Sequence, residues 1–219
     1  MKFYESGDSS KPVIFLFPGT CCLYSSFDHV LDGLHSYFYT VTVSYDGFDP
    51  NEKTEFYSME DECEKIEQEI RKKHGRSIKA AYGCSLGGSF VSLLIQRKRI
   101  HIEHGIIGSS DMDEAGNLVA KIQASMVVPF MYKMVHTGAL PKFMQKKLNK
   151  TDEAKKELYN GFLNMFGIGK GGSPWITKQS IYNQFYSDLV TKVQHGIDVP
   201  GTTTVSYTHL RAHETAANL

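Results

Sequence analysis

Ser85 has the setting of a nucleophile. It lies in the stretch Gly83-Cys84-Ser85-Leu86-Gly87, which fits the pattern G-x-S-x-G between two apolar runs. In this pattern a strand turns sharply into a helix, so that the serine hydroxyl stands above the sheet edge at the helix N-terminus. Small residues are needed there because the backbone is crowded. The pattern therefore predicts nucleophilic catalysis by Ser85, and the plainer alternative is a serine in an inert, glycine-bounded turn.

A serine nucleophile also needs backbone N–H groups that stabilise the oxyanion formed when a carbonyl is attacked. The N–H of Leu86, directly after the serine, is predicted to be one of them. The apolar run 13–17 is followed by a Pro-Gly turn, whose placement resembles the loop that supplies the second donor. We assign this second donor to Thr20, with Cys21 as the neighbouring alternative.

Strands and helices in alternation must position these groups. Apolar and β-branched runs predict buried strands, and helical stripes lie between them. One of these helices is expected to begin at a Ser58 cap and to end at Gly75. Such alternation at short intervals implies an α/β fold with a doubly wound, mostly parallel sheet. The expected strands cover residues 13–17, 38–43, 78–82 and 102–107.

The character of the chain changes after Asp111. Helical patterns rich in Met, Phe and Tyr follow without a convincing strand, which predicts an inserted helical subdomain. Ser173 and Pro174 predict the start of a helix that returns to the core, and a further core strand is expected to begin near Val199. We therefore divide the chain into the N-terminal part of the core (1–111), a helical cap (112–172), a return to the core (173–203) and a distinct tail (204–219).

The order of strands, glycine loop and serine turn over residues 11–110 resembles the α/β-hydrolase superfamily. The cap and the helix returning to the core also match the plan of that family. The resemblance implies a nucleophile, an acid and a histidine in that order along the chain. The acid is expected after the strand that follows the cap, and the histidine beyond the last strand. The resemblance implies no metal and no organic cofactor.

The segment that should carry the acid and the histidine reads GTTTVSYTHLRAHETAANL. Residues 204–219 resemble the translation, in one reading frame, of a transposase-type sequencing adapter. We interpret them as an artefact and the residues up to Thr203 as native. The last core strands, the acid and the histidine are then expected to be missing, and His209 and His213 are rejected as bases because of their origin.

Two further candidates precede that segment. His195 is a poor base, because it comes before the expected strand, on the side opposite to the catalytic loops. Asp111 follows the strand after the serine turn and is an alternative acid. The plainer interpretation of Asp111 is an acidic residue in the loop that leads into the cap.

The amino-acid composition limits the kinds of partner that the chain is expected to bind. The 219 residues carry a formal net charge of zero, which gives no electrostatic reason to bind nucleic acid or an anionic membrane surface. No stretch is interpreted as a membrane span, and the first residues lack the apolar segment of a signal peptide. The four cysteines show no disulfide framework, so a cytoplasmic location is expected. The stretch 167–172 matches a dinucleotide-binding pattern but follows no strand, and we interpret it as a linker.

The expected substrate is a small carboxylic ester or a related acyl compound, bound under the cap. Met126, Phe130, Met131 and Met134 fall at helical spacing and either pack in the core or line an acyl pocket. The leading hypothesis is a serine hydrolase that works through an acyl-enzyme. Acyl transfer on the same fold and non-catalytic binding of a small molecule are the alternatives. The chain itself is expected to be inactive and prone to aggregate.

Overall fold

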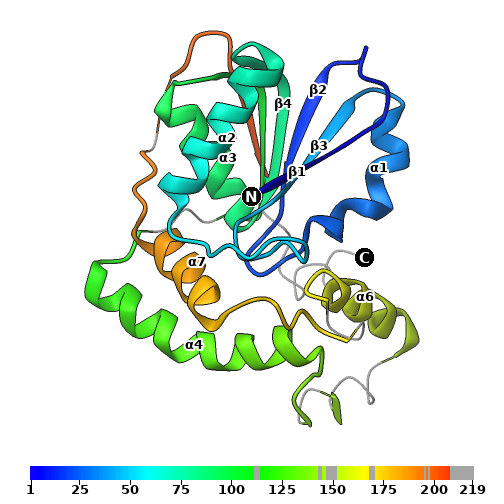
Figure 1. Ribbon diagram of the computed structural model, residues 1–219, viewed down its shortest axis with the longest axis vertical. Helices are drawn as coiled ribbons and strands as arrows, with labels where there is room; N and C mark the ends of the chain where they lie inside the picture. Colours follow the sequence, from blue (N-terminus) through cyan, green and yellow to red (C-terminus); the bar gives the residue numbers. More distant parts are fainter. Residues whose placement is uncertain are drawn as a thin grey trace.

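A six-stranded sheet forms the centre of the fold (Figure 1). Its strands are β1 (Lys2–Ser6), β2 (Val13–Phe17), β3 (Tyr39–Ser44), β4 (Ser77–Cys84), β5 (His101–Gly108) and β6 (Thr203–Tyr207), in the spatial order β1-β3-β2-β4-β5-β6. β1 runs antiparallel to β3, and the other neighbours are parallel. The computed structural model describes residues 1–110, 114–142, 145–146, 152–167, 171–194, 196 and 198–207.

Helices α1 (Asp28–His35), α2 (Met59–His74) and α3 (Leu86–Arg97) cover the two faces of the sheet. Phe15 and Phe17 of β2 belong to one core cluster, together with residues of α2 and α3, whereas Ile14 and Leu16 belong to a second cluster beside α1. Because successive side chains of a strand point to opposite faces, a strand covered on both faces must be apolar throughout. The continuous apolar run of β2 meets this need, and the predicted doubly wound fold is confirmed.

The ends of α2 follow the sequence prediction. The Ser58 hydroxyl accepts a hydrogen bond from the backbone N–H of Asp61 at 3.1 Å, which satisfies one free donor of the first turn. Gly75 ends the helix with φ 65°, in the left-handed region that glycine adopts without strain. A short 3-10 helix, η1 (Tyr24–Phe27), precedes α1 on the other face.

β1 is a strand that no apolar run indicates. Its residues are mostly half-buried, as is typical of an edge strand with one polar face. Phe3 packs against the main core cluster, and Lys2 to Ser6 pair with β3 in antiparallel register. Tertiary pairing rather than hydrophobic content therefore makes this segment a strand.

The predicted cap (112–172) contains α4 (Asn117–Thr137) and α6 (Glu153–Asn164), and α7 (Lys178–Val190) lies in the predicted return to the core. Figure 1 shows α7 between α4 and the sheet. In the described residues between β5 and β6 every regular element is helical, as a helical insertion requires.

The predicted start of α7 is wrong. The helix begins at Lys178 and is capped by Thr177, whose hydroxyl accepts the Ser180 N–H at 3.0 Å. Ser173 instead donates its N–H to the carbonyl of Val135 at 2.7 Å, so it ties the loop to the end of α4. The Ser173-Pro174 pair therefore belongs to a buried loop that contacts α4, and not to the start of a helix.

The predicted apolar stripe of α4 is split between two surroundings. Met134 is buried and Met131 is half-buried, whereas Met126 and Phe130 are exposed. Residues four apart are not fully in line on a helix of about 3.6 residues per turn, so the stripe winds around α4. Toward the N-terminal end of α4 its residues therefore no longer face α7. At 21 residues α4 is also long and apolar enough to cross a membrane, a property that soluble core helices share. The sequence interpretation had found no such stretch.

β6 follows the cap a few residues later than the sequence predicts. The expected start was Val199, and the strand begins at Thr203 and pairs in parallel with β5. Most of β6 therefore lies in the tail that resembles an adapter. Threonine, valine and tyrosine favour strands whatever their source, so the pairing does not decide the origin of the segment. The artefact interpretation of residues 204–219 stays a prediction.

Candidate active site

Ser85 occupies the turn between β4 and α3. β4 ends at Cys84 and α3 begins at Leu86. The backbone of Ser85 has φ 55° and ψ −126°, a conformation that residues with a side chain rarely adopt. Its N–H donates to the carbonyl of Gly108 on β5 at 2.8 Å, and its side chain is exposed. A strained serine that is open to solvent is typical of a functional position.

Close backbone packing requires the two glycines of the turn. A Cβ on Gly83 would lie 2.0 Å from the carbonyl oxygen of Gly87. A Cβ on Gly87 would lie 2.1 Å from the carbonyl oxygen of Phe17, at the end of β2. Both distances are far inside van der Waals contact, so side chains are excluded at both positions. The serine turn is thereby packed directly on the end of the neighbouring strand.

The start of α3 leaves N–H groups free beside the serine. The first N–H groups of a helix have no acceptor within it. Those of Gly88 and Ser89 donate to the Ser85 carbonyl at 2.8 and 3.2 Å, whereas those of Leu86 and Gly87 have no acceptor among the described residues. The first turn of α3 carries no acidic side chain, so the positive end of the helix dipole is not neutralised there. This end of the helix suits a developing negative charge.

The loop after β2 lies against the same turn. A Cβ on Gly19 would be 3.7 Å from the Cβ of Ser85. The N–H of Cys21 donates to Oε1 of Gln184 at 2.7 Å, so it is already engaged. In the part of the chain that the structure describes, no hydrogen bond engages the N–H of Thr20. These contacts favour Thr20 over Cys21 as the second donor. The bond to Gln184, on α7, could not be inferred from the sequence.

Thiols near the serine turn are held in their neutral form. Cys21 and Cys22 are buried in the loop after β2, and Cys84 is half-buried. Burial, with Cys84 close by, raises the pKa of the Cys22 thiol to about 12. Burial also raises the pKa of Cys84. Because the thiolate is the reactive form of cysteine, these three thiols are poor nucleophiles near neutral pH.

The residues that the sequence analysis weighed as partners of Ser85, including those it rejected, fall outside the described residues. This holds for Asp111, His195, His209 and His213. Within the described ranges, no histidine or carboxylate hydrogen-bonds the Ser85 hydroxyl. The structure thus brings together Ser85, the proposed nucleophile, and the two proposed oxyanion loops, and its described residues give no position for the acid or the base.

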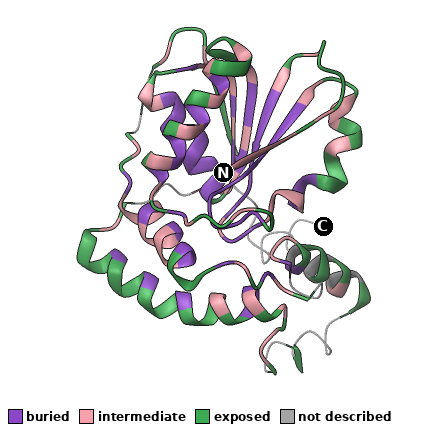
Figure 2. Cartoon of the chain, in the orientation of Figure 1, coloured by how far each residue is buried: buried purple, intermediate pink, exposed green. Residues whose placement is uncertain are grey.

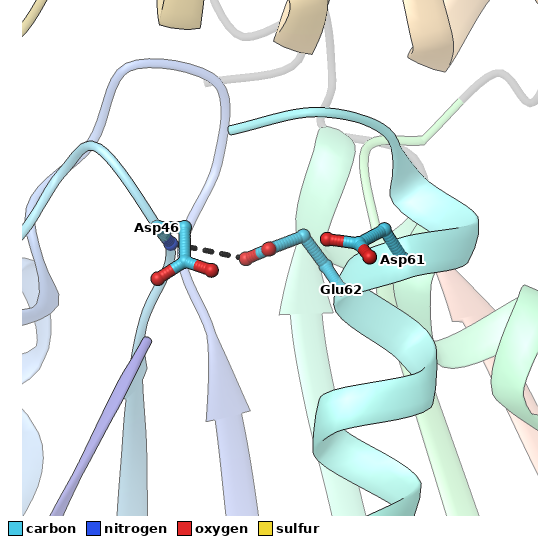
Figure 3. Close-up of side chains that lie close together, drawn as sticks. All are labelled: Asp46, Asp61 and Glu62. Carbon is cyan, nitrogen blue, oxygen red and sulfur yellow. Dashed lines mark hydrogen bonds between the residues drawn. The ribbon is translucent and has the colours of Figure 1, made fainter. Parts of the chain in front are cut away.

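A cluster of carboxylates lies at the end of β3 and the start of α2. The side chains of Asp46, Asp61 and Glu62 approach one another, and their oxygens lie within 4.8 Å (Figure 3). The Lys65 ammonium pairs with all three, and the Met1 ammonium pairs with Asp46 and with Glu52, so two cations offset part of the negative charge of the cluster. Burial and the nearby Asp46 charge raise the pKa of Glu62 to about 7. We interpret the cluster as an ion-pair network that joins β3 to α2.

Comparisons with known proteins support the fold. No family model and no curated protein matches the chain. A Desulfitobacterium hafniense protein assigned to the alpha/beta hydrolase family superposes with a TM-score of 0.63 at 15% identity, over 86% of this chain and 72% of that one. A thermophilic esterase from Thermogutta terrifontis gives 0.67 at 13%, over 94% and 73%. A structure from work on carboxylesterases of Nitrososphaera gargenis gives 0.67 at 13%, over 94% and 75%. The chain has the α/β-hydrolase fold.

Proposed function

We propose that Ser85 is the nucleophile of a serine hydrolase that cleaves a small carboxylic ester or a related acyl compound. The observation that carries the proposal is the backbone of Ser85, which is held at φ 55° between β4 and α3 with an exposed side chain. Strain of this kind persists only where the surroundings impose it. Here the packing of Gly83 and Gly87 imposes it.

The proposed chemistry proceeds through an acyl-enzyme. The Ser85 oxygen attacks the carbonyl carbon while a histidine takes the hydroxyl proton. The N–H groups of Thr20 and Leu86 stabilise the negative charge on the former carbonyl oxygen. The tetrahedral intermediate collapses, the bond to the alcohol breaks, and the histidine gives its proton to the departing oxygen. Water then attacks the acyl-enzyme by the same route and releases the acid.

The histidine and the acid that orients it belong, in this proposal, to native sequence that continues beyond Thr203. The chain of 219 residues is then a poor hydrolase by itself. A protein in which the native continuation replaces residues 204–219 should be active. This part of the proposal depends on the origin of the tail and not on the geometry of the serine turn.

Hydrolysis of p-nitrophenyl acetate by the protein with its native continuation tests the proposal. We expect turnover that Ser85→Ala abolishes, together with labelling of Ser85 by a fluorophosphonate probe. Ser36→Ala changes an exposed serine after α1 and serves as the matched control. Cys84→Ala should keep most of the activity, because its thiol is not the nucleophile. Full turnover by Ser85→Ala would refute the assignment.

A further inference from the structure

Helix α4 turns an apolar face toward solvent. The residues of this outer face are Leu118, Val119, Ile122, Met126, Val127 and Phe130, each at least 40% exposed. Leu118, Ile122 and Met126 are four residues apart and form one continuous stripe, with exposed fractions of 73%, 53% and 75%. Soluble proteins rarely expose such a continuous patch without a partner.

The opposite face of α4 is already used. Ala120, Ala124 and Val128 are buried, and α4 packs against α7 along this side. Figure 2 shows exposed positions along most of α4, interrupted by the few buried ones. The contact with α7 holds α4 in place, so its outer face keeps a fixed orientation toward solvent.

The charges of α4 identify the kind of partner. The helix contains no aspartate or glutamate, and its two lysines, Lys121 and Lys133, are exposed. Within the described part of the chain, neither lysine takes part in an ion pair. Lys142 and Lys146, just after the helix, are exposed as well. An apolar stripe flanked by lysines complements a surface with apolar depth and negative headgroups.

Pairing with a second copy of the chain fits less well. Because α4 has no acidic residue, contact between two outer faces would bring lysines toward lysines in either orientation. Crossing a membrane fits less well too, because the Ala120 face would have to leave α7. A helix that lies in the plane of a lipid surface keeps this contact and buries the outer face in the headgroup region.

We propose that the outer face of α4 docks the cap onto an anionic lipid surface. The cap thereby faces the bilayer, where esters of low solubility gather. The docking uses none of the residues of the serine turn. Ser85→Ala should therefore bind lipid as the unchanged protein does, so that failure of this proposal and failure of the proposed hydrolase are distinguishable.

Flotation on a sucrose gradient with lipid vesicles tests the docking, because aggregated protein does not float. We expect the protein to float with vesicles of phosphatidylcholine and phosphatidylglycerol, and far less with phosphatidylcholine alone. The double change Ile122→Gln and Met126→Gln should weaken binding about tenfold or more, since it removes the centre of the buried stripe. Glutamine is a good helix former, and circular dichroism should show unchanged helix content.

Two controls separate lipid docking from general stickiness. Tyr37→Gln removes an equally exposed apolar side chain (73%) just before β3, at the opposite end of the parallel strands from the cap, and should leave flotation unchanged. Lys121→Gln with Lys133→Gln should reduce binding to the anionic vesicles. The proposal is overturned by absence of flotation, or by equal flotation of the Ile122 and Met126 double variant. A concentration-dependent dimer that this variant abolishes in sedimentation velocity would overturn it too.

Discussion

The side-chain oxygen of Gln184 accepts a hydrogen bond from the backbone N–H of Cys21 at 2.7 Å, in the buried interior. Gln184 belongs to α7, and Cys21 lies in the loop beside Ser85, with φ 60°. Helix α7 therefore holds the loop that carries the proposed Thr20 donor. This contact makes the geometry of the oxyanion site depend on a residue that the chain reaches only after the whole cap.

We expect Gln184→Leu to lower the free energy of unfolding by about 1–3 kcal/mol, because the Cys21 N–H would stay buried without an acceptor. The Nε2 of Gln184 is buried without a partner among the described residues, which moves the expected cost toward the lower end of this range. Urea denaturation measures the change. In the protein with its native continuation, kcat should fall while KM changes little, and Gln184→Glu should restore part of kcat. Unchanged kcat and stability in Gln184→Leu would mean that the loop keeps its shape without this bond.

Gly87→Ala should be among the most destabilising single changes. Its Cβ would lie 2.1 Å from the backbone oxygen of Phe17, which cannot move without breaking the register of β2. We expect a loss of about 3 kcal/mol or more, or failure to fold. Gly33→Ala is the matched control, because a Cβ there meets nothing within 4 Å and α1 gains a better helix former. That control should gain about 0.5–1 kcal/mol in the same thermal or urea experiment.

The stability of the fold should fall as the pH rises through about 7 because of Glu62. Its pKa in the folded state lies above the ordinary value of 4.5, so the folded state holds the proton more tightly than the unfolded chain does between these values. The contribution of the protonated form is complete at low pH and lost above about 7. Glu62→Gln should flatten the change in Tm between pH 5 and pH 8, because it removes a pH-dependent contribution to the free energy of unfolding on the order of 2 kcal/mol.

Glu60→Gln is the control for this prediction, since Glu60 is an exposed carboxylate in the same helical turn. Its Tm profile between the two pH values should run parallel to that of the unchanged protein. Identical profiles for Glu62→Gln and the unchanged protein would show that the carboxyl is ionised throughout. The cationic partners of Asp46 lower its pKa. The stability that the ionised Asp46 contributes to the fold is therefore lost only at a more acidic pH.

The origin of residues 204–219 can be read from the source DNA. Long reads through the codon for Thr203 should show a frame that leaves the adapter-like sequence and continues into a strand, an acid and a later histidine. If the genome instead encodes VSYTHLRAHET, the tail is native. His209 and His213 would then return as candidate bases.

Features set by local sequence were predictable. The apolar run 13–17, the Ser58 cap and the turn at Ser85 depend on neighbours in the chain, and the structure has each where the sequence places it. Features set by distant contacts were not. β1 is a strand because it pairs with β3, and Ser173 meets Val135 instead of capping α7. The bond from Cys21 to Gln184 leaves no local signal at all.

The pairing of β5 with β6 closes a loop that contains the entire cap. Strands β1 to β5 pair with one another within the first 108 residues, whereas β6 pairs with β5 across the whole inserted segment. The entropy of closing a loop grows only with the logarithm of its length, about 0.6 kcal/mol for each doubling. The inserted segment can therefore grow or shrink at little entropic cost, as long as the contact of α7 with the Cys21 loop beside the serine turn is kept.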